Sequence, residues 1–95
     1  MRRSKLEIYI DVLEAFAKNG PIRLTKVTLK AKISYIPLKK ITANLVAENL
    51  VEEKRTENYM TYSATPKAKM VLSRLKEIKQ SLPSLEQSLP EISDY

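Results

Sequence analysis

The stretch SYIPLKKITANLVAEN, residues 34–49, decides the fold. At about 100° per residue, a helix over this stretch separates two sides. The side suited to packing carries Leu38, Ile41, Thr42, Leu45 and Asn49. The opposite side carries Ile36, Lys40, Ala43 and Ala47. Ser34 is a good N-cap. Pro37 stands at the third helical position, where a backbone N–H would have no intrahelical acceptor, so its absence in proline costs no helical hydrogen bond. We therefore predict a helix that packs one side on a core and exposes the other.

A first helix is predicted over residues 4–18. Its apolar residues follow the three-and-four spacing of a helix with one buried face. They are Leu6, Tyr9, Ile10, Leu13, Phe16 and Ala17. Ser4 and Glu7 have the spacing of a capping box, which favours a helix start at this point. Asn19-Gly20-Pro21 is typical of a helix end.

A second, shorter helix is predicted between these two. Ile22 and Leu24 suit a very short strand, after which Thr25 is expected to cap a helix that runs to about Ala31. Leu24, Val27 and Ala31 would be buried, and Lys26 and Lys30 would point outward. Two helices joined by a short turn, the second with a small and basic outer face, indicate a helix-turn-helix.

Two strands and a last helix are predicted after residue 49. Residues 50–55 and 59–64 alternate as strands do, and residues 56–58 have the length and composition of a hairpin turn. A hairpin after a helix-turn-helix is a wing. Thr65-Pro66 then opens a helix that we expect to end near Ser81. The fold class is therefore mainly α with a small β-hairpin (α+β), in the order helix-strand-helix-helix-strand-strand-helix. Residues 1–65 would form the winged helix-turn-helix domain.

The last helix is predicted to join two subunits. Its apolar residues fall on the a and d positions of a heptad pattern. They are Ala68, Val71, Leu75, Ile78 and Leu82. We expect Val71 and Leu72 to pack within their own subunit, and Leu75, Ile78 and Leu82 to make the dimer contact. Because Pro83 and Pro90 each disfavour a continuous helix, we assign 66–82 to the dimerisation helix and 83–95 to a partly ordered acidic tail.

Composition favours a polyanion partner and argues against enzymes. The net charge of the 95 residues is +6. Residues 84–95 hold Glu86, Glu91 and Asp94 and no Lys or Arg, so they contribute −3 and leave +9 for the rest. Such a basic body suits the phosphates of a nucleic acid. With no His, no Cys and one Gly, the chain lacks the residues of a His-based triad, a zinc cluster or a phosphate-binding glycine loop. We expect a non-enzyme with no metal and no cofactor.

The beginning of the chain predicts neither a signal peptide nor a membrane span. It starts with basic residues, but Glu7, Asp11 and Glu14 interrupt the apolar segment that either would require. We therefore expect a soluble, cytoplasmic protein that does not interact with membranes.

Several segments resemble an archaeal winged helix-turn-helix family of small DNA-binding regulators and chromatin-associated proteins. They are SKLEIYIDVLEA, the NGP turn, LTKVTLKAKISY, ENLVEE and YSAT, which together span about residues 4–79. The resemblance implies a dimer that binds double-stranded DNA and whose C-terminal helix often pairs as an antiparallel coiled coil. The family commonly has Gly where Asn49 and Ala68 stand, and Asn is the next best residue at a left-handed helix end.

Candidate DNA-binding residues lie first on the third helix. Lys39 and Lys40 suit phosphates or guanine edges, and Asn44 suits adenine. Ile36 and Ala43 suit a thymine methyl group. Tyr35 lies at the margin between the two sides of the helix, where packing is its favoured role and a phosphate contact the alternative. The alternative for the whole face is a solvated helix surface.

Further candidates come from the other elements. Lys26, Lys30 and Lys32 belong to the helix that usually crosses the DNA backbone. Lys54 and Arg55 would lie on the wing, where Glu52, Glu53 and Glu57 weaken the positive field. Phosphate contact is expected for Lys26, Lys30 and Lys32, whereas the basic N-terminal arm of Arg2, Arg3 and Lys5 is interpreted as a mobile solubilising end.

Two functions follow from these patterns. The first is a homodimeric DNA-binding regulator or chromatin-associated protein. The alternative is a protein-protein interaction module, in which the C-terminal helix and the apolar tail between Leu82 and Ile92 dock on a larger complex, since a fold does not fix a function. No small-molecule effector is evident in the sequence.

Overall fold

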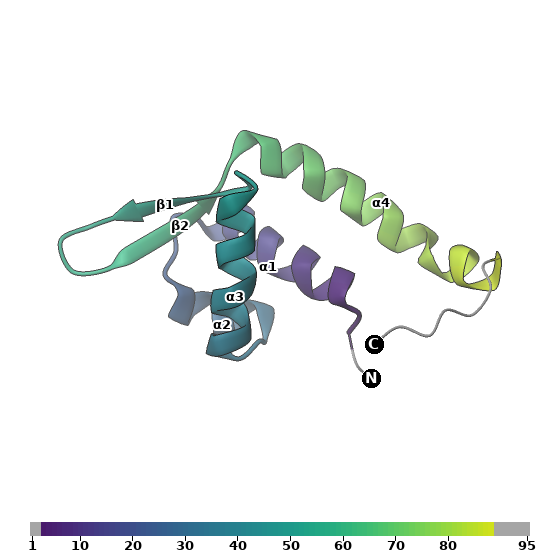
Figure 1. Ribbon diagram of the computed structural model, residues 1–95, viewed down its shortest axis with the longest axis horizontal. Helices are drawn as coiled ribbons and strands as arrows, with labels where there is room; N and C mark the ends of the chain where they lie inside the picture. The colour runs from purple at the N-terminus through teal and green to yellow at the C-terminus, as the bar shows by residue number, and fades with distance from the viewer. Residues whose placement is uncertain (1–2, 89–95) are drawn as a thin grey trace.

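The structure, a computed structural model, describes residues 3–88 and the side chains of residues 3–81. In this part of the chain the elements are α1 (Lys5–Asn19), α2 (Leu24–Ala31), α3 (Tyr35–Ala47), β1 (Val51–Arg55), β2 (Met60–Ala64) and α4 (Pro66–Ser88). Figure 1 shows the β1–β2 hairpin projecting at one end of the molecule and α4 running toward the other. This order confirms the predicted fold class, a winged helix of mainly α structure.

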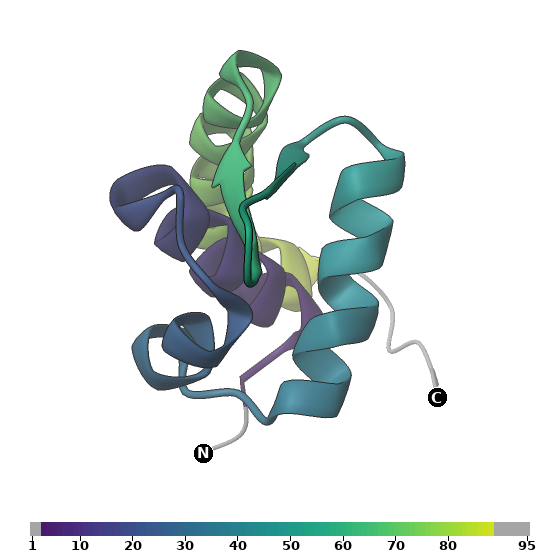
Figure 2. The same cartoon turned by 90° about the vertical axis from the view of Figure 1, so that its left-hand side faces the viewer.

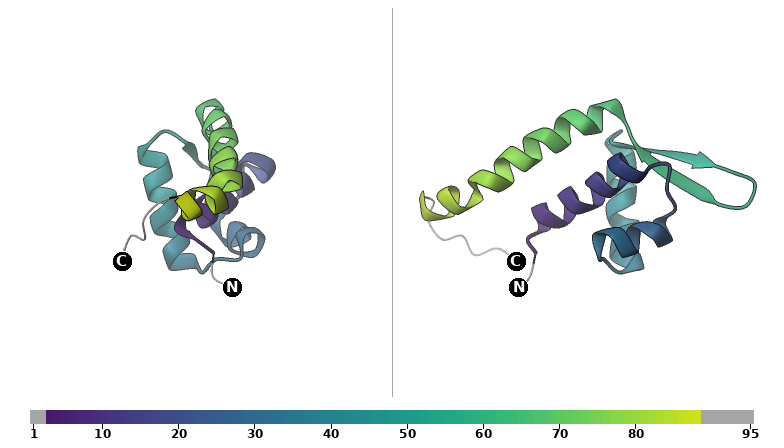
Figure 3. Two further views of the ribbon diagram at one scale, coloured as in Figure 1. Left: turned by 90° about the vertical axis from the view of Figure 1, so that its right-hand side faces the viewer. Right: turned by 180° about the vertical axis from the view of Figure 1, so that it is seen from behind.

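Helix α1 is the centre of the core. The predicted capping box forms, because the Glu7 N–H donates to Ser4 Oγ at 3.1 Å and the Ser4 N–H donates to Glu7 Oε1 at 2.9 Å. These hydrogen bonds lower the pKa of Glu7. Ile10, Leu13 and Phe16 of the predicted face are buried, and the rest of that face is partly buried. Val12 and Ala15 are buried as well, because α2, α4 and β2 all pack on α1 (Figures 2 and 3). The expectation of a single buried face was therefore wrong, because α1 is buried on more than one side.

The end of α1 approaches β2 closely at Gly20. The Gly20 N–H donates to the Phe16 carbonyl at 3.0 Å, which closes the helix. A Cβ at this position would lie 2.5 Å from that carbonyl oxygen and 2.8 Å from the Ser63 Cβ. The single glycine of the sequence is thus required by this close approach, and its own φ of −71° is available to any residue.

The predicted strand at Ile22 and Leu24 is reduced to one bridge. Ile22 and Tyr62 exchange both backbone hydrogen bonds at 2.9 Å, which ties the chain before α2 to the wing. Leu24 already begins α2 and is buried, so the N-cap is Arg23 instead of the expected Thr25. Helix α2 starts earlier than predicted because Leu24, its first residue, packs in the core.

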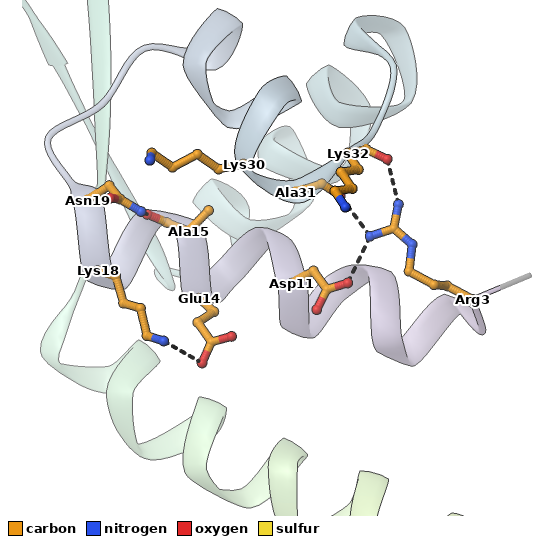
Figure 4. A pocket seen from close by; sticks show the side chains of 9 residues that line it. All are labelled: Arg3, Asp11, Glu14, Ala15, Lys18, Asn19, Lys30, Ala31 and Lys32. Atoms are coloured by element: carbon orange, nitrogen blue, oxygen red, sulfur yellow. Dashed lines mark hydrogen bonds and ion pairs between the residues drawn. The ribbon is translucent and has the colours of Figure 1, made fainter.

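Arg3 does not belong to a mobile arm. Its Nη1 donates to Asp11 Oδ2 at 2.8 Å and to the Ala31 carbonyl at 2.7 Å, and its Nη2 donates to the Lys32 carbonyl at 2.6 Å (Figure 4). The last carbonyls of α2 and of its left-handed C-cap, Lys32, therefore have a cationic partner, which suits the negative end of a helix. Arg2 lies outside the described residues.

We expect the Arg3→Ala variant to lose about 1–2 kcal/mol of unfolding free energy, because hydrogen bonds from a charged donor are lost at a partly exposed site. Urea denaturation measures this loss. The matched control is Arg74→Ala, which removes the same charge from an exposed position of α4 and should change stability by less than about 0.5 kcal/mol. Equal effects of the two changes would contradict the assigned role of Arg3.

The hairpin forms close to the predicted residues. Strands β1 and β2 pair antiparallel from Val51 with Ala64 to Arg55 with Met60. The turn is closed at Tyr59, whose carbonyl accepts from the Thr56 N–H and the Thr56 hydroxyl, both at 2.8 Å. Asn49 precedes the hairpin with a φ of 61°, the left-handed conformation for which Asn is suited.

Helix α4 begins as predicted but ends later. Thr65 caps it, because its Oγ1 accepts from the Ala68 N–H at 3.1 Å and donates to the Asn49 carbonyl at 2.7 Å. The helix continues through Pro83 to Ser88, so its predicted end near Ser81 was wrong. A proline inside a helix removes one hydrogen bond and tends to bend the helix, and the ribbon changes direction in its last turns (Figure 1).

Helix α4 packs along α1 (Figure 3). Ala68 and Leu72 are buried, and Leu75 packs on the same core although it was assigned to a partner subunit. Lys76 forms an ion pair with Glu14, and this contact is the main reason that the pKa of Glu14 lies below its ordinary value. The first turns of α4 therefore complete the domain core.

Candidate nucleic-acid interface

Helix α3 has one buried side and one exposed side. Leu38 is fully buried, and Thr42 and Leu45 lie beside it in the core. Ile36 is 69% exposed on the other side, where Lys40 and Ala43 are also exposed. Ser34 is the N-cap, as predicted, although its side chain makes no capping hydrogen bond. We call the exposed residues Ile36, Lys39, Lys40 and Ala43 the outer face of α3.

All of the residues selected from the sequence for DNA contact are exposed. They are Tyr35, Ile36, Lys39, Lys40, Ala43, Asn44, Lys26, Lys30, Lys54 and Arg55. They come from α2, α3 and the wing, the elements that the helix-turn-helix order brings together. Exposure leaves each of them available for contact with a ligand.

Asn44 is held on one flank of α3. Its Nδ2 donates to the Tyr9 hydroxyl of α1 at 3.2 Å. A bidentate contact with adenine uses both the amide donor and the carbonyl acceptor. Asn44 would therefore have to exchange its bond to Tyr9 for a base contact, whereas the residues of the outer face are not restricted in this way.

The other flank of α3 faces the wing across a hollow of about 260 Å³. Lys39 and Ala43 line it from α3, and Glu53 and Tyr62 line it from the hairpin. Burial raises the pKa of Tyr62, and the neighbouring Glu53 carboxylate raises it further. Glu53 thus places a negative charge between the outer face and the wing, next to a lysine selected for phosphate contact.

Two residues that the sequence did not single out connect the wing with α2. The Arg23 guanidinium carbon lies 4.6 Å from the centre of the Tyr59 ring, within the range of a cation–π contact. Arg23 is the N-cap of α2, and Tyr59 closes the wing turn. They are far apart in the sequence, so no local pattern signals their contact.

Tyr35 shares a hollow of about 250 Å³ with Arg23 and Tyr59. It is 45% exposed, so the predicted preference for packing describes only part of this side chain. Its place at the start of α3 leaves the ring accessible beside the wing.

Helix α2 presents Lys26 and Lys30 to the surface. Lys30 lies beside a mixed cluster in which Lys18 pairs with Glu14 at 3.5 Å and Arg3 pairs with Asp11 at 2.8 Å (Figure 4). The acidic partners offset part of the positive charge there. Lys26 has no such partner within the part of the chain whose side chains are described.

Two negative findings apply to the described residues. Residues 3–88 include no helix that is long and apolar enough to cross a membrane. The side chains described in the structure include no group of three or more acidic, His or Cys residues that could hold a metal ion.

Comparison with known proteins places these features among winged helices. A family model described as winged helix-turn-helix matches residues 2–82. The solved structure of Sso10a-2, described as a DNA-binding protein from Sulfolobus solfataricus, is similar with a TM-score of 0.74 and 26% identity, over 90% of this chain and 92% of that one. The transcriptional regulator BldR from Sulfolobus solfataricus is similar with a TM-score of 0.70 and 20% identity, over 88% of this chain and 62% of that one.

A protein of unknown function from Listeria innocua has the same fold, with a TM-score of 0.66 and 21% identity, over 90% of this chain and 60% of that one. No curated protein sequence matches significantly. The chain thus spans nearly all of Sso10a-2 and about three fifths of the other two proteins.

Proposed function

Because the chain belongs to the winged helix-turn-helix family, we propose that it binds double-stranded DNA with the outer face of α3 in the major groove. The observation that carries the proposal is this face itself, which is exposed, basic and made of side chains small or flexible enough to approach base edges. The DNA-binding character of Sso10a-2, similar over almost the whole of both chains, supports it. A role in transcription or chromatin organisation follows.

Each element has a proposed part in binding. Lys39 and Lys40 contact phosphates or guanine edges from the outer face of α3. Lys26 and Lys30 of α2 contact the phosphate backbone, which positions the protein without reading sequence. Lys54 and Arg55 reach the adjacent backbone from the wing, with secondary roles for Tyr35 and Asn44.

We also propose that α4 joins two subunits. Ile78 is 44% exposed on α4, and Met70 is 67% exposed nearer the start of this helix. Leu75 packs on its own core, so Ile78 is left as the principal described contact of the seam. The side chain of Leu82, also assigned to the seam, lies outside the described residues. Two copies of α3 would then contact one duplex.

The test of DNA binding is a salt titration. Neutralising about six phosphates should lower the affinity for a duplex about a thousandfold between roughly 50 and 200 mM salt, because each neutralised phosphate releases counterions. Fluorescence anisotropy with a random-sequence duplex measures the affinity. A flat salt response would contradict the phosphate contacts.

The same samples distinguish the protein-protein interaction module. Sedimentation gives the mass in solution, and a mobility shift gives DNA binding directly. A monomer that binds no duplex at low salt would favour the interaction module, and a dimer that binds would favour the DNA-binding protein. Comparing a selected duplex with a scrambled one then separates site-specific from general binding.

We expect the Glu53→Gln variant to bind DNA about two- to threefold more tightly at low salt, because the change removes a negative charge beside the outer face of α3. The gain should shrink as salt screens the charge. Glu77→Gln is the matched control, since it removes one carboxylate from the exposed surface of α4. A gain of equal size in the control would assign the effect to net charge.

A further inference from the structure

A hollow of about 570 Å³ lies between the start of α1, the α2–α3 turn and the flank of α3 that carries Asn44. Its apolar lining comes from all three segments and consists of Ile8, Tyr9, Ile33, Pro37 and Ile41. Four of these side chains are only partly buried against the core, so they leave apolar surface facing the hollow. The volume lies within the range of small-molecule pockets in proteins.

The hollow exists because α1 and α3 pack on different partners. Helix α1 packs on α2, α4 and β2, whereas α3 packs mainly on α2 and β1. Two sets of hydrogen bonds hold the surrounding segments in place. Asn44 of α3 donates to Tyr9 of α1 at 3.2 Å, and Arg3 donates to the carbonyls of Ala31 and Lys32 before the α2–α3 turn. The hollow is therefore formed before a ligand arrives.

The charges around the hollow have one sign. Lys5, Lys32 and Lys40 line it and are exposed, and no acidic residue lines it. Neither Lys32 nor Lys40 forms an ion pair with any residue whose side chain is described. Arg3 also lines the hollow, but its guanidinium is already bound to Asp11 and to backbone carbonyls. An apolar wall bordered by basic and no acidic side chains suits a ligand that has an apolar body and a negative charge.

We propose that this hollow binds an amphipathic organic monoanion, such as a medium-chain carboxylate. Its hydrocarbon part packs on Ile8, Ile33 and Ile41, and its carboxylate pairs with Lys32 and Lys40. A phosphate or other small inorganic anion would leave the apolar wall uncovered, and an uncharged ligand would leave the two lysines without a partner. This binding site goes beyond the proposed DNA-binding function and requires no DNA.

The proposal is tested with octanoate and its uncharged analogue octanamide. The methyl resonances of Ile8, Ile33 and Ile41 in the full-length protein should shift saturably with octanoate. Octanamide should bind at least about fivefold more weakly, because it lacks the charge that the lysines recognise. Absence of saturable shifts at these methyl groups, or equal affinity for both compounds, would overturn the proposal.

Two charge-reversal variants separate a local site from net charge. Lys40→Glu should weaken octanoate binding at least about fivefold and leave octanamide binding within about twofold. Lys69→Glu makes the same change on the exposed surface of α4 and should leave octanoate binding unchanged. Both positions are exposed, so neither change disturbs the core. Equal weakening by the two variants would overturn the local site. Because these measurements contain no DNA, their outcome is independent of the proposed DNA binding.

Discussion

The combined change of Lys39 and Lys40 to alanine is expected to weaken duplex binding by about thirtyfold. Both lysines lie exposed on the outer face of α3, and each proposed contact is worth roughly 1–3 kcal/mol. A combined loss of about 2 kcal/mol corresponds to that factor. The slope of affinity against salt concentration should also become shallower, because fewer phosphates are neutralised. Anisotropy titrations of the variant at several salt concentrations measure both quantities.

The control for this prediction is the double change of Lys69 and Arg74 to alanine. It removes two positive charges from exposed positions on α4, away from the outer face of α3. We expect a loss of less than about threefold, since only the long-range field changes. Similar losses in the two double variants would indicate diffuse electrostatic binding without a recognition helix. Arg3 is unsuitable as a control because it holds the end of α2.

Replacing Gly20 with alanine is expected to lower the unfolding free energy by about 2–3 kcal/mol. The new methyl group would lie 2.5 Å from the Phe16 carbonyl oxygen and 2.9 Å from the Ser63 Cα, both backbone atoms. Relief therefore requires the end of α1 and β2 to move apart, and overpacking of this kind typically costs about 1–3 kcal/mol. Thermal and urea denaturation measure the loss.

Ser34→Ala is the companion to the glycine variant. Ser34 is exposed and its side chain makes no capping hydrogen bond, so the change should alter stability by less than about 0.5 kcal/mol. If Gly20→Ala were equally harmless, the close packing of α1 against β2 would be wrong. Gly20→Ala is also expected to weaken the Ile22–Tyr62 bridge to the wing, because Ile22 is only two residues from the substituted glycine.

Local patterns in the sequence were sufficient for most of the architecture. The capping box at Ser4, the N-cap at Ser34 and the left-handed Asn49 each depend on residues that are neighbours in the chain. Periodicity also separated the buried Leu38 from the exposed Ile36, because one helix face meets the core at every third or fourth residue. These features need no knowledge of the remaining chain.

Long-range contacts were beyond such patterns. Arg3 contacts Ala31, 28 residues away. Nothing in the neighbouring sequence distinguishes Arg3 from the other basic residues near the N-terminus, so this contact could not be predicted. The contact of Arg23 with Tyr59 and the hollow beside Ile41 likewise depend on how separate elements meet. Leu75 follows the heptad pattern equally well whether it packs on α1 or on a partner, so only the position of α1 decided its place.

The anchoring of the wing affects the entropy of complex formation. Two contacts join the hairpin to the segment before α2: the Ile22–Tyr62 bridge and the cation–π contact of Arg23 with Tyr59. Its orientation relative to α2 is therefore set during folding, and the conformational freedom of the hairpin is lost before any partner is met. A free, swinging loop would lose that freedom on association and bind more weakly for the same contacts. In the proposed complex with DNA, the wing would already be ordered, and its contacts would contribute to affinity with little loss of conformational entropy.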